Sequence, residues 1–518
     1  MKISITILFY SICLLVSSQD NIRFAKRYLA PFYQYEYNNV LATDSCYWIS
    51  GWGTDTIKPN YWTAVIAKFD LNGNLLLKKE LRANITDFGW PEGIYYHSNK
   101  IYTLYLQPYD SAKLVTYDIL KDSLYVFRSF GPMEDSQYLF TPYLFLNNQG
   151  EIFVTWSSNI NSGKKFKMEV YLIKLDSLGN ELLNKRITFN DRWFILRGIK
   201  ESKDSNIIIH GFLSLEYYQK NNDESKRDYI LVLNNKGDSL TSITYRYSMN
   251  SGIRDLIQIE DNSYICATTI LSHKGSITGL PAIIRMDARG RLKWSIIPDS
   301  AFLSDYWFST SGSIVKLEKI NLNNYTALGN MELKDEVNPS RGSGNVRIVM
   351  LNFDTLGKVN WQRIYSMDSA NNVFHAFDFK RTMDGGYIIC GSGDSITPAI
   401  TLVNAAILIK TDSFGCIVPD CHKFVNVDDV VKGKHKAFEI YPNPIAGNRF
   451  YVLSRISSAQ NYRVLFINIM GQIVHSTSIQ AQAGMQYILS RPANIPSGEY
   501  VIQIVGKEFI QTEKIIFE

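Results

Sequence analysis

Short apolar segments alternate with tight polar turns from residue 22 to residue 421. The clearest turn follows an aliphatic strand and has Asp or Asn with Gly three residues later, as in LIKLDSLG and LIKTDSFG. Asp or Asn at the first position and Gly at the fourth are typical of type I turns. The turn recurs at seven positions, once in a degenerate form at Asp118: Asp70, Asp118, Asp176, Asn234, Asp287, Asp354 and Asp412.

Each repeat predicts four antiparallel strands. A second strand precedes the Asp turn, a short turn and an apolar stretch precede that strand, and in the first six copies another strand follows. Units of four short strands are typical of β-propeller blades, and no amphipathic segment of helical length interrupts them. The sequence therefore predicts an all-β fold with a seven-bladed β-propeller over residues 22–421. An array of β-sandwiches is the alternative.

The last repeat lacks a convincing fourth strand, because CIVPDC follows the turn at Asp412. The N-terminal segment RFAKRY, residues 23–28, resembles WQRIY, residues 361–365, which is the outer strand of the sixth repeat. We therefore expect residues 23–28 to pair beside residues 407–412 and close the ring, which removes an exposed sheet edge. An unrelated leading strand is the alternative.

Two further segments flank this region. Residues 1–18, MKISITILFYSICLLVSS, combine Lys2, an apolar run and two small residues, which is the layout of a cleaved signal peptide. The run is too short for a membrane span, so we expect an exported chain with no transmembrane segment. Residues 422–436 are polar and aperiodic and predict a linker. Residues 437–518 alternate again between Gly and Pro breaks, which predicts a small immunoglobulin-like β-sandwich.

Composition narrows the possible partners. Among 518 residues, 54 Lys and Arg oppose 49 Asp and Glu, and a net charge of +5 is too weak to indicate nucleic acid. Six cysteines occur, and five remain once Cys13 leaves with the signal peptide. Cys46, Cys266 and Cys390 lie in apolar strand-like runs and are predicted to be buried thiols. Cys416 and Cys421 are the candidate disulfide.

The C-terminal segment carries motifs in a fixed order. They are YPNP (Tyr441, Pro442, Asn443, Pro444), INIMGQIV with Gly471, IPSGEYVIQI with Gly498 and Tyr500, and the terminal EKIIFE. In this order the segment resembles the type A C-terminal sorting domain of the type IX secretion system. The resemblance implies that this machinery is a partner, that export runs through the periplasm, and that the protein is secreted or attached to the outer cell surface. It also implies a Bacteroidota source, and exported propellers of that group are similar to residues 384–415.

Chemical motifs are scarce. The seven histidines form no HExxH pattern, and neither a GxSxG elbow nor a calcium loop occurs, so we predict no catalytic residue, metal or cofactor. Three loops place Asp shortly before Trp, and exposed Trp beside a carboxylate can bind sugar rings. The ligand candidates are therefore Asp87 with Trp90, Asp191 with Trp193, and Asp305 with Trp307. In the alternative, each Trp is a wedge between neighbouring blades.

These observations favour a non-enzymatic binding or adhesion module with a polysaccharide or protein ligand. The alternative is a secreted glycan-active or other hydrolytic enzyme on the same scaffold. A third possibility is a structural surface protein without a specific ligand. Convergent carboxylates with a histidine at the mouth of the propeller tunnel would favour the enzyme.

Overall fold

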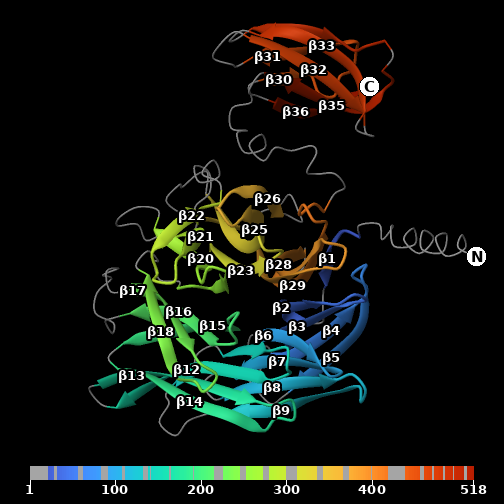
Figure 1. Ribbon diagram of the computed structural model, residues 1–518. Helices are drawn as coiled ribbons and strands as arrows, with labels where there is room; N and C mark the ends of the chain where they lie inside the picture. The colour runs from blue at the N-terminus through green and yellow to red at the C-terminus, as the bar shows by residue number, and fades with distance from the viewer. Residues whose placement is uncertain are drawn as a thin grey trace, which may run out of the picture. The chain divides into compact units, whose positions relative to one another are not determined.

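The fold was analysed in a computed structural model of the chain (Figure 1). It describes residues 22–28, 32–55, 62–82, 91–107, 111–131, 138–139, 142–162, 165–190, 192–214, 226–245, 252–271, 279–298, 312–334, 342–365, 373–397, 400–417, 438–454, 460–468, 472–481, 485–493, 495–506 and 510–518. The signal peptide and the linker predicted from the sequence lie outside these ranges. The chain divides into two compact units, residues 1–419 and 420–518.

The first unit is built from antiparallel runs of four strands that follow one another in the chain. Four such runs are β6 (Pro91–His97), β7 (Lys100–Gln107), β8 (Ser111–Asp118) and β9 (Ser123–Phe130); β15 (Trp193–Glu201), β16 (Ile207–Ser214), β17 (Lys226–Leu233) and β18 (Ser239–Tyr245); β19 (Asp255–Gln258), β20 (Tyr264–Leu271), β21 (Gly279–Met286) and β22 (Leu292–Ile296); and β23 (Ser313–Lys319), β24 (Asn324–Lys334), β25 (Gly342–Asp354) and β26 (Val359–Tyr365). In another sheet, β10 (Tyr138–Leu139) and β11 (Tyr143–Leu146) both pair with β12 (Ile152–Ser162), followed by β13 (Lys165–Leu175) and β14 (Glu181–Asn190).

The two ends of the first unit meet in one sheet (Figure 1). Its strands are β27 (Phe374–Arg381), β28 (Tyr387–Thr397), β29 (Ile400–Thr411), β1 (Phe24–Tyr28), β2 (Phe32–Ala42), β3 (Tyr47–Asp55), β4 (Trp62–Phe69) and β5 (Leu75–Arg82). β1 pairs with β29 in antiparallel register, with Phe24 opposite Lys410 and Tyr28 opposite Ala406. The predicted pairing of the N-terminal strand is therefore confirmed.

Matched sequences make matched contacts at this closure. The Tyr28 hydroxyl donates to the carbonyl oxygen of Gly73 at 2.6 Å, and the Tyr365 hydroxyl donates to that of Gly415 at 2.9 Å. The Phe24 ring and the Trp361 ring cover the same two glycines. β1 thus covers the glycine turn of the first run as β26 covers that of the last run. This shared role explains why RFAKRY and WQRIY are alike.

Buried apolar clusters join each run of strands to the next. Leu104 packs in one cluster with Trp156, and Leu172 in another with Phe194. The last run also packs on the first, because Leu408 of β29 shares a cluster with Tyr37 of β2. Comparable clusters join the other neighbours. The runs therefore form a closed series of propeller-like sheets.

The Asp turns have the predicted geometry. At Asp176 the carboxylate accepts the N–H groups of Leu178 at 2.9 Å and Asn180 at 2.8 Å, and the N–H of Gly179 donates to the Asp176 carbonyl oxygen at 3.0 Å. Asp118 has no such glycine, and its carboxylate accepts the N–H groups of Leu120 and Lys121, both at 3.1 Å.

One turn shows why glycine and tryptophan recur together. Gly357 has a φ of 87°, which favours glycine. An added Cβ would also meet the Trp294 ring at 2.9 Å. Trp294 belongs to the preceding sheet, and its Nε1 donates to the Thr355 carbonyl oxygen at 3.0 Å. The Trp of DARGRLKW therefore covers the turn of the following repeat.

The second unit consists of two sheets around one core. One sheet contains β30 (Phe438–Tyr441), β31 (Arg449–Ser454) and β34 (Gln486–Ser490). The other contains β33 (Ile473–Ala481), β32 (Gln460–Asn468), β35 (Gly498–Val505) and β36 (Ile510–Phe517). Phe450 from the first sheet packs with Phe466 and Phe517 from the second. None of the described segments forms a helix with the length and apolar character that a membrane crossing requires.

Candidate functional site

Most of the ligand residues predicted from the sequence lie outside the described ranges: Asp87, Trp90, Asp191, Asp305 and Trp307. Trp193 is described at the start of β15. It is half-buried and packs on the cluster that joins the sheet of β12–β14 to the sheet of β15–β18. This position matches the wedge alternative, and stacking of Trp193 on a sugar stays a prediction.

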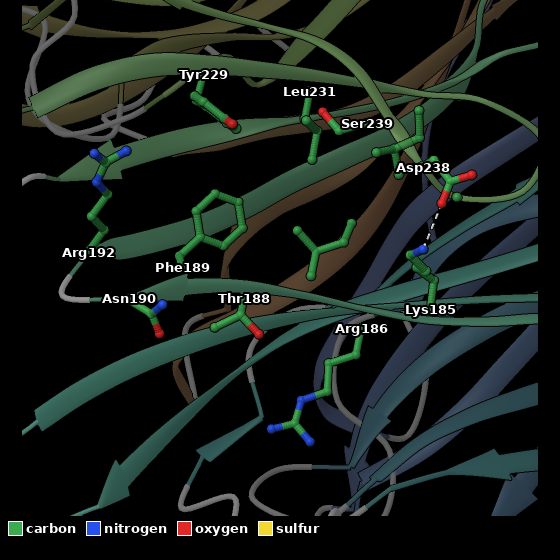
Figure 2. Close-up of a pocket in the computed structure, with 13 residues that line it drawn as sticks. Lys185, Arg186, Thr188, Phe189, Asn190, Arg192, Tyr229, Leu231, Asp238 and Ser239 are labelled. Atoms are coloured by element: carbon green, nitrogen blue, oxygen red, sulfur yellow. Dashed lines mark hydrogen bonds and ion pairs between the residues drawn. The ribbon is translucent and has the colours of Figure 1, made fainter.

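A pocket of about 510 Å³ lies between β14 and the strands β17 and β18 (Figure 2). Phe189 and Tyr229 line it with rings 5.8 Å apart in an edge-to-face contact. Lys185 at its rim pairs with Asp238 at 2.9 Å, and Arg186 pairs with buried Glu169. The pocket therefore offers an aromatic surface at which Lys185 and Arg186 are already paired, while Arg192 also lines it.

A different group of charged residues lies on the first strands of the runs. These strands contact one another from one run to the next, as β2 contacts β6 and β27, and β23 contacts β19 and β27. Several carry a register shift near the middle, for example between Glu92 and Ile94 and between Leu196 and Gly198. Such a bulge redirects a side chain that regular pleating would place elsewhere. We call Glu92, Arg197, Lys200, Arg254, Asp255, Lys316, Glu318, Asp378 and Lys380 the inner-strand cluster.

Two carboxylates of the inner-strand cluster join the first strands of neighbouring runs. Asp255 accepts the N–H of Leu317 at 2.8 Å and contacts Nζ of Lys200 at 2.6 Å. Asp378 accepts the N–H of Val40 at 3.1 Å. Burial would raise the pKa of Asp255, but Lys200 and Lys316 outweigh burial and hold that pKa at about 2. Both side chains are nearly inaccessible, so their role is structural.

A buried histidine interacts with members of the inner-strand cluster. His210 is buried on β16, and its Nδ1 lies 3.0 Å from the carbonyl oxygen of Ile253. Burial lowers the pKa of His210 to about 4, although Asp255 raises it. His210 is therefore a neutral ring held on the backbone. The convergent carboxylates and histidine that would favour an enzyme are present, but Asp255, Asp378 and His210 are already engaged. Glu318 also accepts the N–H of Arg381 at 3.0 Å.

The remaining members of the cluster are less well paired. Arg197 occupies the bulge of β15, and Arg254 directly precedes β19. In both, Nε is buried and has no hydrogen-bond partner within the described part of the chain. Burial and the like charge of Arg197 lower the pKa of Arg254 to about 10. Burial raises the pKa of Glu92 to about 7, although Lys316, Arg197 and Arg254 lower it.

Sequence analysis missed this cluster. Each charge interrupts an otherwise apolar first strand, in FILRGIK, GIRDLIQ, SIVKLEK and HAFDFKR. A single charge in a strand is ordinary, and only its recurrence at the same place in several repeats was a usable signal. Within the described ranges no group of three His, Cys, Asp or Glu residues could hold a metal ion.

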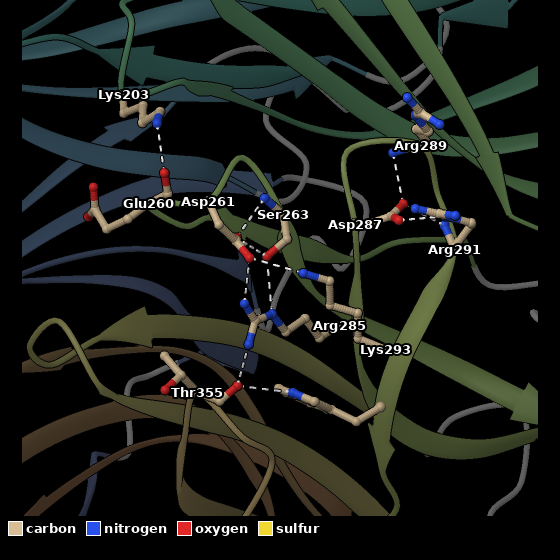
Figure 3. A network of polar contacts seen from close by, with 11 residues as sticks. Lys203, Glu260, Asp261, Ser263, Arg285, Asp287, Arg289, Arg291, Lys293 and Thr355 are labelled. Atoms are coloured by element: carbon tan, nitrogen blue, oxygen red, sulfur yellow. Dashed lines mark hydrogen bonds and ion pairs between the residues drawn. The ribbon is translucent and has the colours of Figure 1, made fainter.

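A second polar network joins two sheets through their turns (Figure 3). Arg285 donates to Asp261 at 2.8 Å and to the Thr355 carbonyl oxygen at 2.7 Å, and Lys293 lies 3.0 Å from Asp261. Burial opposes ionisation of Asp261, but hydrogen bonds from Ser263 and Lys293 lower its pKa. Arg285 and Lys293 thus both pair with Asp261, and the Arg285 contact with Thr355 indicates a structural link between the two sheets.

The cysteines divide into two groups. Cys46, Cys266 and Cys390 are free and buried. Cys416 is disulfide-bonded, while Cys421, its predicted partner, lies outside the described residues.

In the second unit the YPNP segment holds the C-terminal strand. Asn443 donates to the Lys514 carbonyl oxygen at 2.7 Å and accepts the N–H of Ile516 at 3.0 Å. Tyr441–Pro442 and Asn443–Pro444 are both cis peptides. Tyr500 is buried against Phe517, and Gly498 begins β35 with a φ of 145°. Gly471 lies outside the described residues. The motif residues thus hold the end of the chain in place.

Residues 439–518 match the family model of the secretion system C-terminal sorting domain. The second unit is a secretion-system sorting domain. The predicted resemblance of this segment is therefore confirmed. The sorting domain indicates export, with the protein at the cell surface or released.

Comparison with curated proteins finds no match. Among solved structures, a mutant of the Synechocystis apocarotenoid oxygenase is similar with a TM-score of 0.42 and 10% identity, over 77% of this chain and 95% of that one. The cobalt-substituted form of that oxygenase gives 0.40 at 10% identity over the same shares. A protein of unknown function from Dyadobacter fermentans gives 0.37 at 10% identity, over 60% of this chain and 95% of that one. Similarity at this level carries no argument about activity.

Proposed function

We propose that this protein is a type IX secretion cargo in which a seven-bladed β-propeller serves as a non-enzymatic binding or adhesion module outside the cell. The sorting domain at residues 439–518 is the observation that carries the proposal. The four-strand runs, with β1 completing the run of β27–β29, support the blade number. In this proposal the second unit directs export of the protein, and the propeller binds the ligand.

The inner-strand cluster supports binding rather than catalysis. General acid–base chemistry needs two groups that are free to exchange protons with a substrate. Asp255 and Asp378 already accept backbone N–H groups from the first strand of the next run, and His210 is fixed on a carbonyl oxygen. Glu318 accepts the N–H of Arg381 at 3.0 Å, so Glu92 is the one carboxylate of the four that makes no hydrogen bond within the described residues. A scaffold with one such group favours recognition.

Export can be tested by deleting residues 437–518 in a host that has the secretion system. We expect the full chain at the cell surface or in the medium and the truncated chain inside the envelope, measured by fractionation and by protease access in whole cells. A Ser478→Ala chain, altered at an exposed position of β33, should localise like wild type. Arrival of the truncated chain at the surface would refute the sorting role.

Binding can be tested by presenting the purified mature chain to a glycan array. Selective retention of one glycan class, without release of sugar products, supports a binding module. Release of reducing sugars from the retained glycans would favour the hydrolase instead.

A further inference from the structure

The inner-strand cluster contains more positive than negative charge. Its members act on one another electrostatically: five cations, Arg197, Lys200, Arg254, Lys316 and Lys380, and four carboxylates, Glu92, Asp255, Glu318 and Asp378. Lys200 pairs with Asp255 at 2.6 Å and Lys316 with Asp378 at 3.8 Å. Lys380 is the cation with the largest effect on Glu318. Two arginines and one glutamate remain, which leaves one positive charge without a counter-charge.

The two arginines are brought together by equivalent positions in neighbouring sheets. The β-bulge between Leu196 and Gly198 leaves Arg197 outside the ladder of β15. Arg254 holds the corresponding place ahead of β19, where its N–H donates to the Ala267 carbonyl oxygen at 2.9 Å. Both side chains are half-buried, so solvent still reaches them although their Nε atoms are inaccessible.

Such a pair is costly without a ligand. Two like charges in a partly dry environment repel each other, and buried N–H donors without acceptors lose hydrogen bonds that water would supply. Both costs fall on Arg197 and Arg254, whose Nε atoms have no acceptor among the described residues. Glu92 acts on both arginines but forms no ion pair with either within that part of the chain. The arrangement therefore lacks one anionic acceptor.

We propose that Arg197 and Arg254 form a binding site for a single carboxylate group of the propeller's ligand. A guanidinium presents a planar fork of N–H donors that matches the two oxygens of a carboxylate. A carboxylate carries one negative charge, which balances the one excess positive charge of the cluster, whereas a phosphate monoester would overcompensate it. Tyr143 of β11 interacts electrostatically with Arg254. This inference rests on the proposed function of the propeller as a binding module. It specifies a carboxylate as the ligand group that the propeller recognises.

The test is calorimetric titration of the full mature chain with acetate, glucuronate, inorganic phosphate and uncharged glucose. We expect saturable binding of acetate and glucuronate and none of glucose. Arg197→Gln and Arg254→Gln should each weaken binding about ten-fold or more, the usual effect of losing a charged hydrogen bond. Arg289→Gln, at an exposed turn position, should bind like wild type.

Several results would overturn the site. They are the absence of saturable carboxylate binding, equal binding by the two arginine variants and wild type, and tighter binding of phosphate than of acetate. If a variant fails to fold, protection in the wild-type chain decides: glucuronate should shield Arg197 and Arg254 from phenylglyoxal, read by peptide mass, and unshielded arginines refute the site. The titration needs no secretion. Lost export with intact binding would therefore refute only the sorting role, and lost binding with intact export only this site.

Discussion

At the scale of single residues, the inner-strand cluster shows how charge is tolerated inside an all-β scaffold. A lone lysine or aspartate on a strand would lose hydration on burial. Here Lys200 finds Asp255 from the next sheet, and that carboxylate also accepts a backbone N–H from the sheet beyond it. Partners that lie some 60 residues apart leave no local trace in the sequence, so the pattern predicted the strands without predicting the cluster.

Glu92 gives a prediction for pH dependence. Its pKa is about 7 in the folded chain and about 4.3 in an unfolded one. A raised folded pKa means that stability is fully present below the unfolded pKa and is lost as pH rises through the folded value. Wild type should therefore lose about 2 kcal/mol relative to Glu92→Gln between pH 5 and pH 8. Urea unfolding at both pH values measures this difference.

The control is Glu181→Gln, which removes a more exposed glutamate at the start of β14. Its stability relative to wild type should change little between the two pH values. An equal difference between Glu92→Gln and wild type at pH 5 and pH 8 would show that Glu92 does not titrate in this range.

Trp193 marks the limit of residue-level inference from the sequence. Asp191 followed by Trp193 fits a sugar platform and a wedge equally well, because an aromatic ring near a carboxylate is compatible with both. Its packing on the cluster between two sheets matches the wedge alternative, and such packing depends on tertiary structure rather than on the neighbouring residues in the sequence.

At the scale of elements, the four-strand repeat could be predicted because the turn residues and the apolar pattern of the strands indicate the same boundaries. The Asp carboxylates accept turn N–H groups wherever the pattern placed them, as at Asp287 and Asp354. Closure was also predictable, because Phe24 and Tyr28 repeat the spacing of Trp361 and Tyr365 on one strand face. Register shifts such as that at Arg197 were not predictable, because a bulge adds one residue without a distinctive sequence signal.

Deletion of residues 23–28 should destabilise the first unit. It removes the half-buried rings of Phe24 and Tyr28, worth about 1 to 2 kcal/mol each, together with five residue pairs along β29. We expect a loss of about 3 kcal/mol or more and concentration-dependent association through the uncovered edge. Urea unfolding and size-exclusion chromatography measure the two effects.

Ala25→Ser is the matched variant for this deletion, because Ala25 is the exposed residue of β1. It should behave as wild type in both measurements. A deleted chain that stays monomeric with an unchanged unfolding midpoint would mean that β1 contributes nothing to closure.

At the scale of the whole molecule, the chain combines a repeat scaffold with a sorting domain that has a core of its own. The core of the second unit consists of residues between 438 and 517. The sequence predicted this unit from motifs that follow a fixed order. What the first unit binds was less predictable, because five of the six Asp and Trp candidates lie outside the described ranges and the inner-strand cluster is assembled from separate runs of strands.

Separate cores predict separate unfolding. Asn443→Ala removes two hydrogen bonds that hold β36. At about 0.5 to 1 kcal/mol each for exposed bonds, this should cost the sorting domain about 1 to 2 kcal/mol and leave the propeller unchanged. Calorimetry of the full mature chain should then show one transition shifted down and one in place, whereas Ser478→Ala should shift neither. A shift of both transitions with Asn443→Ala would show that the two units unfold as one, and the deletion of residues 437–518 would then test folding as well as sorting.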